Sequence, residues 1–210
     1  MRKLLLVFIG MFCAASLYAE GSQEYCTAIK KAGRFRLGGG YGFLLNPNLD
    51  DIGKLPDSTV VKGGFAGGFQ LLFGSLFDLQ GVFWGVEADV VRTYHYKLTP
   101  PDAGTTKVTF MSIPISLIWE YDVIPKNSRI MPFIQWGLGA SLDQLKTENP
   151  AGSDTHTSTD FVLSVGPGFG IILSDTVSLD TMLKYYLFFT TETSYTQTLN
   201  LTLNLSFRLW

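Results

Sequence analysis

The chain ends with a stretch that alternates strictly between apolar and polar residues, TLNLTLNLSFRLW, from Thr198 to Trp210. A side-chain period of two is that of an extended strand, so this stretch is predicted to be a β-strand with one apolar and one polar face. At about 3.3 Å per residue it reaches roughly 40 Å, whereas a tilted strand crosses a bilayer with about 9–11 residues. The last stretch of the chain is therefore long enough to span a membrane.

The composition agrees with strands of this kind. Only 16% of the 210 residues are charged and the formal net charge is −2, so nucleic acid is not an expected partner. The chain is rich in glycine and in aromatic residues. After the N-terminus there is no run of about 18 apolar residues that could form a membrane-spanning helix. Strands that each carry one apolar face explain an apolar composition of this kind.

The N-terminus has the pattern of a cleaved secretion signal. Arg2 and Lys3 provide the positive end, an apolar core follows at residues 4–12, and small residues lie at 14–19. We predict a signal peptide at residues 1–19 and a mature domain at 20–210. A membrane anchor is the alternative, but the apolar run is too short for one. Cys26 would then be the one cysteine of the mature chain, without an intramolecular disulfide partner.

The two-residue alternation continues along the mature chain. It predicts eight strands, at residues 34–45, 64–74, 82–96, 107–121, 130–142, 159–173, 177–189 and 198–210. Pro114 interrupts the fourth of these strands, so a local bulge is expected there. Longer polar loops, expected at 46–62, 97–106, 143–157 and 191–196, alternate with short turns. An even-stranded meander of this kind is the organisation of an outer-membrane barrel, which closes because lipid leaves no strand edge unpaired.

The direction of the apolar face distinguishes a membrane barrel from a soluble one, whose apolar face points inward. Here nearly every strand carries a large aromatic residue on the apolar face, which is more bulk than eight strands can enclose. These residues gather toward the strand ends, as aromatic girdles at the two membrane interfaces do. We therefore expect the apolar face to contact lipid. The expected girdle residues are Tyr41, Phe43, Phe73, Trp84, Tyr94, Tyr96, Trp119, Tyr121, Phe207 and Trp210.

The polar face is rich in glycine and carries few charges of both signs. A solvated outer face would be dense in Lys and Glu, whereas small residues and opposite charges suit a narrow interior, where an unpaired charge is costly. We expect a charge network in the lumen, in which Arg36, Glu87, Glu120, Lys184 and Arg208 pair with one another. The expected lumen residues are Arg36, Glu87, Asp89, Glu120, Asp180, Lys184 and Arg208.

Several strand patterns, together with the signal peptide and the meander, resemble small bacterial outer-membrane barrels of the OmpA, OmpX and OmpW kind. These patterns are GVEADV at 85–90, SIPISLIW at 112–119, PFIQWGLGAS at 132–141 and VGPGFGI at 165–171. The resemblance covers essentially the whole mature chain. It implies an all-β, eight-stranded antiparallel up-and-down barrel in the cell outer membrane. Its implied partners are outer-membrane lipid and the outer-membrane assembly machinery.

The sequence leaves three functions open. The first is a narrow passive channel for small solutes or small apolar molecules, as in OmpW-like proteins and porins. The second is a surface adhesin or structural barrel, as in OmpX-like proteins, which binds host or matrix molecules through its outer loops. The third is a membrane enzyme using His95, which no motif supports, so the chain is not expected to be an enzyme. No cofactor is expected, because the glycine runs GGGYG and GPGFG lack the full phosphate-binding spacing. No metal is expected either.

Overall fold

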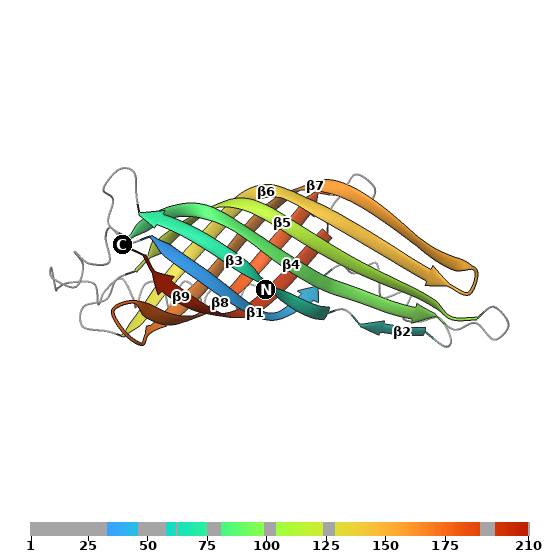
Figure 1. The fold of residues 1–210 in the computed structure, drawn as a ribbon, viewed down its shortest axis with the longest axis horizontal. Coiled ribbons are helices and arrows are strands. Elements are labelled where there is room, and N and C mark those ends of the chain that lie inside the picture. Colours follow the sequence, from blue (N-terminus) through green and yellow to red (C-terminus); the bar gives the residue numbers. More distant parts are fainter. Residues whose placement is uncertain are drawn as a thin grey trace.

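The computed structural model describes residues 33–45, 58–61, 63–74, 81–98, 104–123, 129–189 and 196–209. Within these residues all regular structure is β-strand (Figure 1). No helix in this part of the chain is long and apolar enough to cross a membrane. The signal peptide, Cys26 and Trp210 lie outside the described residues. The strands are β1 (Arg34–Leu44), β2 (Ser58–Val61), β3 (Gly63–Gly74), β4 (Val82–Leu98), β5 (Thr106–Asp122), β6 (Ile130–Asn149), β7 (Gly152–Ile172), β8 (Val177–Phe189) and β9 (Thr196–Arg208).

Eight of these strands form a closed antiparallel barrel. Each strand from β3 to β8 pairs with the next one along the chain. β1 pairs with β3 on one side and with β9 on the other, which closes the sheet. The short β2 pairs only with the far end of β4 and takes no part in the closure. The expected eight-stranded up-and-down barrel is thereby confirmed.

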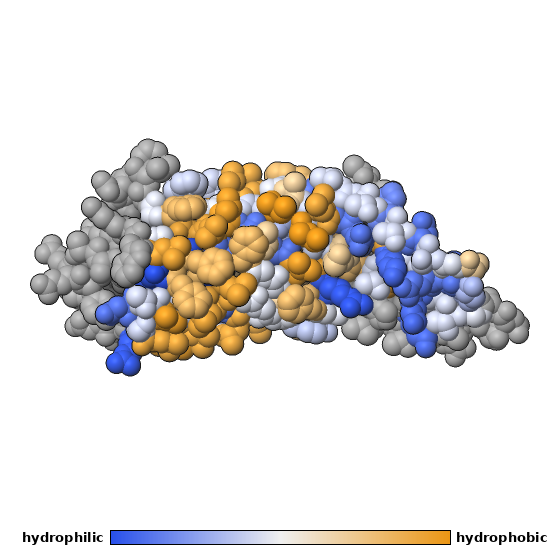
Figure 2. All heavy atoms as spheres, viewed as in Figure 1, coloured by the Kyte–Doolittle hydropathy of each residue, from blue (hydrophilic) through white to orange (hydrophobic). Residues whose placement is uncertain are grey.

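The last strand illustrates how the alternating sequence divides the barrel into an outside and an inside. In β9, Leu203 is 53% exposed on the outer surface, while the adjacent Asn204 is 8% exposed and faces the lumen. The same alternation around the barrel produces an outer belt of exposed leucine, isoleucine, valine and phenylalanine side chains. Figure 2 shows this belt as a hydrophobic zone, beyond which hydrophilic side chains gather toward the right-hand end of the view. The apolar face therefore points outward, which excludes the soluble-barrel interpretation.

The structure corrects the prediction of a long loop at residues 143–157. β6 continues through this region to Asn149 and β7 begins at Gly152, so that a tight hairpin replaces most of the loop. The prediction was wrong because the polarity of the segment was taken as a loop signal. Threonine is well suited to strands, and a hairpin with both faces in water needs no apolar face. In Figure 1 this hairpin and the neighbouring ends of β4 and β5 extend together toward the right-hand end of the view.

Two further expectations need correction. Pro114 lies in regular register opposite Ser141 of β6, and the irregularity of this region is instead a register shift in β4 between Val91 and Tyr94. The predicted loop at 46–62 includes β2, and its residues 46–57 and 62 lie outside the described residues. The loop at 97–106 is shorter than expected, because β4 ends at Leu98 and β5 begins at Thr106. The connection expected at 191–196 lies one residue earlier, between Phe189 of β8 and Thr196 of β9. Residues 99–103 and 190–195 are also outside the described part.

Candidate functional site

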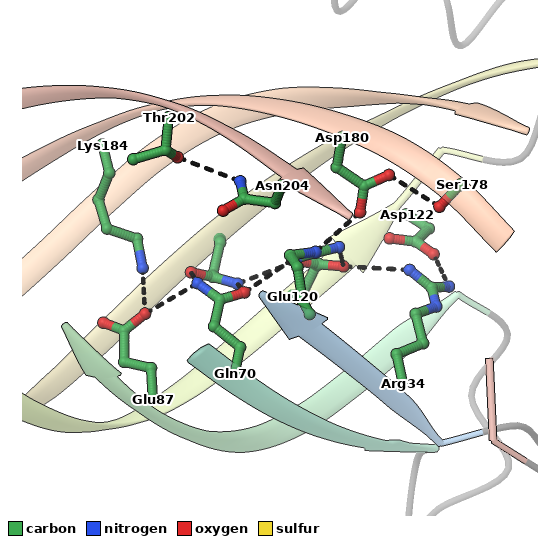
Figure 3. Close-up of polar contacts among 12 residues, drawn as sticks. Arg34, Gln70, Glu87, Glu120, Asp122, Ser178, Asp180, Lys184, Thr202 and Asn204 are labelled. Carbon is green, nitrogen blue, oxygen red and sulfur yellow. Dashed lines mark hydrogen bonds and ion pairs between the residues drawn. The ribbon is translucent and has the colours of Figure 1, made fainter. Parts of the chain in front are cut away.

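The lumen contains a connected group of charged and amide side chains, which we call the lumen cluster (Figure 3). Strand alternation directs these side chains inward from β1, β3, β4, β5, β6 and β8, and all of them are buried. Some contacts join adjacent strands, whereas others, such as Arg36 with Glu120 and Glu87 with Lys184, join strands that are not adjacent and so cross the interior of the barrel. The lumen cluster consists of Arg34, Arg36, Gln70, Glu87, Glu120, Asp122, Gln135, Asp180 and Lys184.

Arg36 is the centre of the cluster. Its guanidinium donates two hydrogen bonds to Glu120, from Nη1 at 2.7 Å and from Nη2 at 3.0 Å. Its Nε donates to Asp180 Oδ2 at 2.8 Å, and its Nη1 also donates to Gln70 Oε1 at 2.8 Å. The fork of an arginine is suited to a bidentate contact with a carboxylate, and burial strengthens such charge-assisted hydrogen bonds. Arg36 thus joins β1, β3, β5 and β8 across the lumen.

Arg34 extends the cluster toward the end of the barrel that carries the short turns. It donates from Nη1 to Glu120 Oε1 at 3.2 Å and forms an ion pair with Asp122. Aromatic rings pack against both arginines: the Cζ of Arg34 lies 4.0 Å from the ring centroid of Phe83, and that of Arg36 lies 4.8 Å from the Phe133 ring. These buried rings fill space beside the charges and provide cation–π attraction.

A second ion pair lies on the side of Gln70 and Gln135 that faces away from the two arginines. Gln70 Nε2 donates to Glu87 Oε2 at 3.0 Å, and Glu87 also forms an ion pair with Lys184 of β8. Tyr186 donates its hydroxyl to Asp89, and the same hydroxyl is 3.4 Å from Glu87 Oε1. Gln70 and Gln135 exchange amide hydrogen bonds at 3.2 Å, which links this pair to the arginine part of the cluster.

The cluster is shielded from solvent. Arg36 is 1% exposed and Glu120 is 0% exposed, so water does not reach either side chain in this conformation. Buried apolar side chains occupy the remaining space around the arginines. An eight-stranded barrel has an interior only wide enough for side chains to fill, which agrees with this packing. Those apolar residues are Leu72, Phe83, Ile118, Met131 and Phe133.

The sequence-predicted lumen residues are placed as follows. Arg36, Glu87, Glu120, Asp180 and Lys184 all belong to the cluster. Asp89 is only partly buried and contacts Tyr186. Arg208 lies at the barrel end, where its Nη1 donates to the backbone oxygen of Asp175 at 3.4 Å.

Sequence reasoning missed four members of the lumen cluster, together with Tyr186 beside it. Arg34 lies two positions before Arg36, and Asp122 lies two positions after Glu120. Both therefore share the inward face of a residue already predicted to face the lumen, and a stricter use of the two-residue alternation would have found them. Gln70, Gln135 and Tyr186 carry no charge at neutral pH, and a search for charged residues omits them. Gln70 and Gln135 nevertheless supply the hydrogen bonds that connect the two halves of the cluster, and Tyr186 joins Asp89 to Glu87.

Most of the expected girdle residues lie on the outer surface. Phe73 and Trp84 pack against one another there, with ring centroids 5.1 Å apart. The side chains of Tyr94 and Tyr96 lie outside the described residues, but the register shift in β4 places their backbones opposite Phe110 and Val108. Their assignment to the outer face assumed that the even-numbered residues of β4 all face outward, and this alternation does not continue past the register shift. The exposed or half-exposed members are Tyr41, Phe43, Phe73, Trp84, Trp119, Tyr121 and Phe207.

Catalytic and metal chemistry has little support in this part of the chain. The backbone of His95 pairs with Thr109 in the β4–β5 ladder, and the side chain of His95 is not among those described. Within the described residues, no group of three or more histidine, cysteine, aspartate or glutamate side chains is arranged to hold a metal ion.

The fold is shared with solved bacterial outer-membrane proteins. A major outer membrane protein from Thermus thermophilus superposes with a TM-score of 0.58 at 14% identity, covering 85% of this chain and all of that one (100%). Neisserial surface protein A superposes with a TM-score of 0.55 at 14% identity, covering 83% and 96%. Ail, the attachment invasion locus protein of Yersinia pestis, gives 0.50 at 13% identity, covering 86% and 99%. A search of curated protein sequences found no match.

A closed antiparallel barrel with an apolar outer belt and a buried ionic interior defines a transmembrane β-barrel of the outer membrane. The family model of the outer membrane protein beta-barrel domain matches residues 4–207. The chain therefore belongs to this family and resides in the outer membrane.

Proposed function

We propose that this barrel is closed and acts at the cell surface through the β6–β7 hairpin. The observation that carries the proposal is the length of the two strands, 20 residues in β6 and 21 in β7. A tilted strand needs only about 9–11 residues to cross a bilayer, so about half of each strand extends beyond the lipid. In outer-membrane barrels the turns on the periplasmic side are short and the longer connections are extracellular. The hairpin tip is accordingly assigned to the outside of the cell.

The hairpin offers a strand edge for binding. β7 pairs with β6 from Gly152 onward, but its pairing with β8 begins only at Phe161. From Gly152 to Thr155, one edge of β7 has no partner strand within the described residues. An exposed edge of this kind is a template on which an extended peptide can add as a further strand. Ail is the attachment invasion locus protein of Yersinia pestis, and we extend a role in attachment to this chain.

The first prediction concerns a variant in which residues 146–155 are replaced by Asn-Gly. Leu145 and His156 are directly opposite one another in the ladder, so a two-residue type I′ turn joins them without a change of register. We expect binding to immobilised laminin, fibronectin or collagen to be lost, because the edge and the tip are removed. Solid-phase binding of the refolded barrel, full-length against shortened, measures this directly.

Folding must be preserved for that comparison to be informative. The shift in gel mobility between heated and unheated samples reports barrel closure, and we expect it to be unchanged in the shortened variant. A control variant with Thr147→Ala in β6 keeps both the hairpin length and the β7 edge, and should retain binding. Equal binding by the shortened and full-length barrels would refute the proposal, as would the absence of binding to all three matrix proteins.

A narrow cation channel is the second candidate. The observation in its favour is the lumen on the extracellular side of the cluster, where Gly40 is exposed and Asp89 is only partly buried. The interior also carries more buried carboxylates than buried cations among the described residues. A negatively charged lumen would favour cations if the arginine layer rearranged to leave a path.

The second prediction separates the two candidates by ion conductance. We expect the refolded barrel to give no steady channels in a planar bilayer, because the lumen cluster fills the cross-section. Steady cation-selective channels whose selectivity falls in Glu87→Gln would instead support the channel. Glu148→Gln removes the same charge from the exposed hairpin, so it should leave any such conductance unchanged.

A further inference from the structure

The unpaired edge of β7 extends from the hairpin tip almost to the start of the β7–β8 ladder. No described strand pairs with this side of β7 before Phe161, and residues 152–157 and Thr159 are exposed. Successive side chains of a strand point to opposite faces, so a strand added here would meet two different rows of side chains. We call residues 152–159 the β7 edge. Its two rows can select a partner as well as hold its backbone.

The outward face of the β7 edge carries only hydroxyl groups. It is the outward face because its residues share the strand phase of the exposed Phe161. Serine and threonine side chains that lie directly opposite one another on two strands can form hydrogen bonds, which favours them as neighbours. A partner strand is therefore expected to present threonine or serine on this face. The residues of the row are Ser153, Thr155, Thr157 and Thr159.

The inner face of the hairpin, which continues the lumen side of the barrel, carries three carboxylates: Asp143, Asp154 and Asp160. Asp160 is opposite Ser141, two residues from Asp143 in β6, and Asp154 is opposite Thr147, four residues from Asp143. Even spacings place all three on one face of the sheet. Asp143 Oδ1 accepts a hydrogen bond from Ser141 at 2.5 Å, but its Oδ2 is buried without a donor among the described residues.

The lysines of this region lie on the opposite, outward face. Lys97 pairs with Lys107, which shares the strand phase of the exposed Ile115. Lys146 shares the phase of the exposed Leu142 in β6. In the described parts of β5, β6 and β7 beyond the apolar belt, the inner face has no lysine or arginine. By composition, the inner face beside the β7 edge is therefore net negative.

Asp154 is the acidic group that an added strand would meet. Its side chain is exposed, and its Oδ1 accepts a hydrogen bond from the backbone N–H of Thr155 at 2.9 Å. A backbone N–H within a ladder is directed at the neighbouring strand, so a donor that is bonded to a side chain instead faces the free side of β7. The carboxylate thus caps a donor that an added strand would use. A lysine or arginine of the partner can bond the carboxylate and release this donor, whereas a neutral side chain offers the carboxylate no replacement charge.

We propose that the β7 edge selects an extended peptide in which lysine or arginine alternates with threonine or serine. The basic residues lie beside Asp154 on the inner face, and the hydroxyl residues lie beside the row of threonines on the outward face. Charge alone does not suit both faces, since a run of consecutive lysines would place every second one against the threonines. The inference rests on the proposed surface binding, because it names the kind of partner that the same edge accepts.

The test measures the binding of short labelled peptides to the refolded full-length barrel by fluorescence anisotropy. The probes are a Thr-Lys repeat, a Thr-Gln repeat, a Thr-Glu repeat and a block peptide in which the threonines of the first probe precede its lysines. We expect the Thr-Lys repeat to bind about fivefold more tightly than the Thr-Gln repeat, because a cross-strand ion pair contributes up to about that factor. The Thr-Glu repeat should bind most weakly. The block peptide has the composition and charge of the Thr-Lys repeat but should bind no better than the Thr-Gln repeat.

Substitutions separate the edge carboxylate from net charge. Asp154→Ala should weaken binding of the Thr-Lys repeat, because the ion pair is lost, and strengthen binding of the Thr-Gln repeat, because the N–H of Thr155 is released. The two affinities should therefore converge. Glu148→Ala removes the same charge from the outward face of β6 and should leave both affinities unchanged. Shifts of opposite sign for two probes cannot arise from a loss of folded barrel, so the comparison does not depend on equal stability of the variants.

Several results would overturn the proposal. Equal binding of the Thr-Lys and Thr-Gln repeats would show that the edge accepts strands without selecting their charge, and would leave the proposed surface binding intact. Equal binding of the Thr-Lys repeat and the block peptide would assign the attraction to charge without strand addition. A rise of every probe in Asp154→Ala would mean that the carboxylate only protects the edge from strand addition. No binding of any probe would refute strand addition at this edge, and with it the edge mechanism of the proposed surface binding.

Discussion

Replacing Arg36 with methionine should lower the free energy of unfolding of the barrel by about 3–5 kcal/mol, the cost of removing one partner from a buried ion pair. Arg36 is fully buried and donates to Glu120, Asp180 and Gln70. Methionine has a similar length but no charge, so the carboxylates would lose their central partner in a low-dielectric interior. Urea titration of the refolded barrel, followed by tryptophan fluorescence, measures the change.

Two comparisons identify the cause of that loss. Lys146→Met removes an exposed ion-pair partner of Glu148 and should cost less than about 1 kcal/mol, because solvent screens surface pairs. Adding Glu120→Gln to Arg36→Met removes one of the unpaired carboxylates and should recover part of the stability, which appears as coupling in a double-mutant cycle. If Arg36→Met and Lys146→Met cost the same, the ionic interior does not stabilise the barrel.

The strand alternation allowed most of the barrel to be predicted from the sequence. It determines which residues face lipid and which face the lumen, because a strand has only two faces and a lipid-facing one must be apolar. Leu203 and Asn204 could be assigned to opposite faces without any knowledge of their neighbours. Closure followed from the requirement that lipid leaves no strand edge unpaired.

The pairing of the lumen charges could not be predicted in the same way. Arg36 contacts Asp180 across a sequence separation of 144 residues, and such a contact depends on the register and tilt of every strand between them. The two-residue alternation predicts that both side chains point inward, but it does not predict the height of each side chain along the barrel axis. The sequence therefore indicated a charge network without identifying Glu120 as the main partner of Arg36.

The region beyond the lipid was the least predictable part. Outside the membrane both faces of a strand can be polar, so alternation of hydrophobicity no longer reports strand structure. The β6–β7 hairpin was taken as a loop for this reason. Lys97, Lys107 and Lys146 are likewise dispersed in the sequence, and only the strand register brings them onto one face.

The largest effect expected on the outer surface is that of Leu203→Arg. Leu203 lies near the middle of β9, opposite Gly39 in the middle of β1, and its side chain points outward into the apolar belt. An arginine at the bilayer midplane costs about 2–4 kcal/mol, whereas the cost falls to about 0–1 kcal/mol near the interface. Leu145→Arg is the control outside the lipid, because Leu145 is exposed in the hairpin beyond the belt, on the inward-facing phase of β6. Urea titration in lipid vesicles should give a loss for Leu203→Arg that is several times that for Leu145→Arg. Equal losses at the two positions would mean that the outer face of β9 does not contact lipid, and the orientation of the barrel wall would have to be reversed.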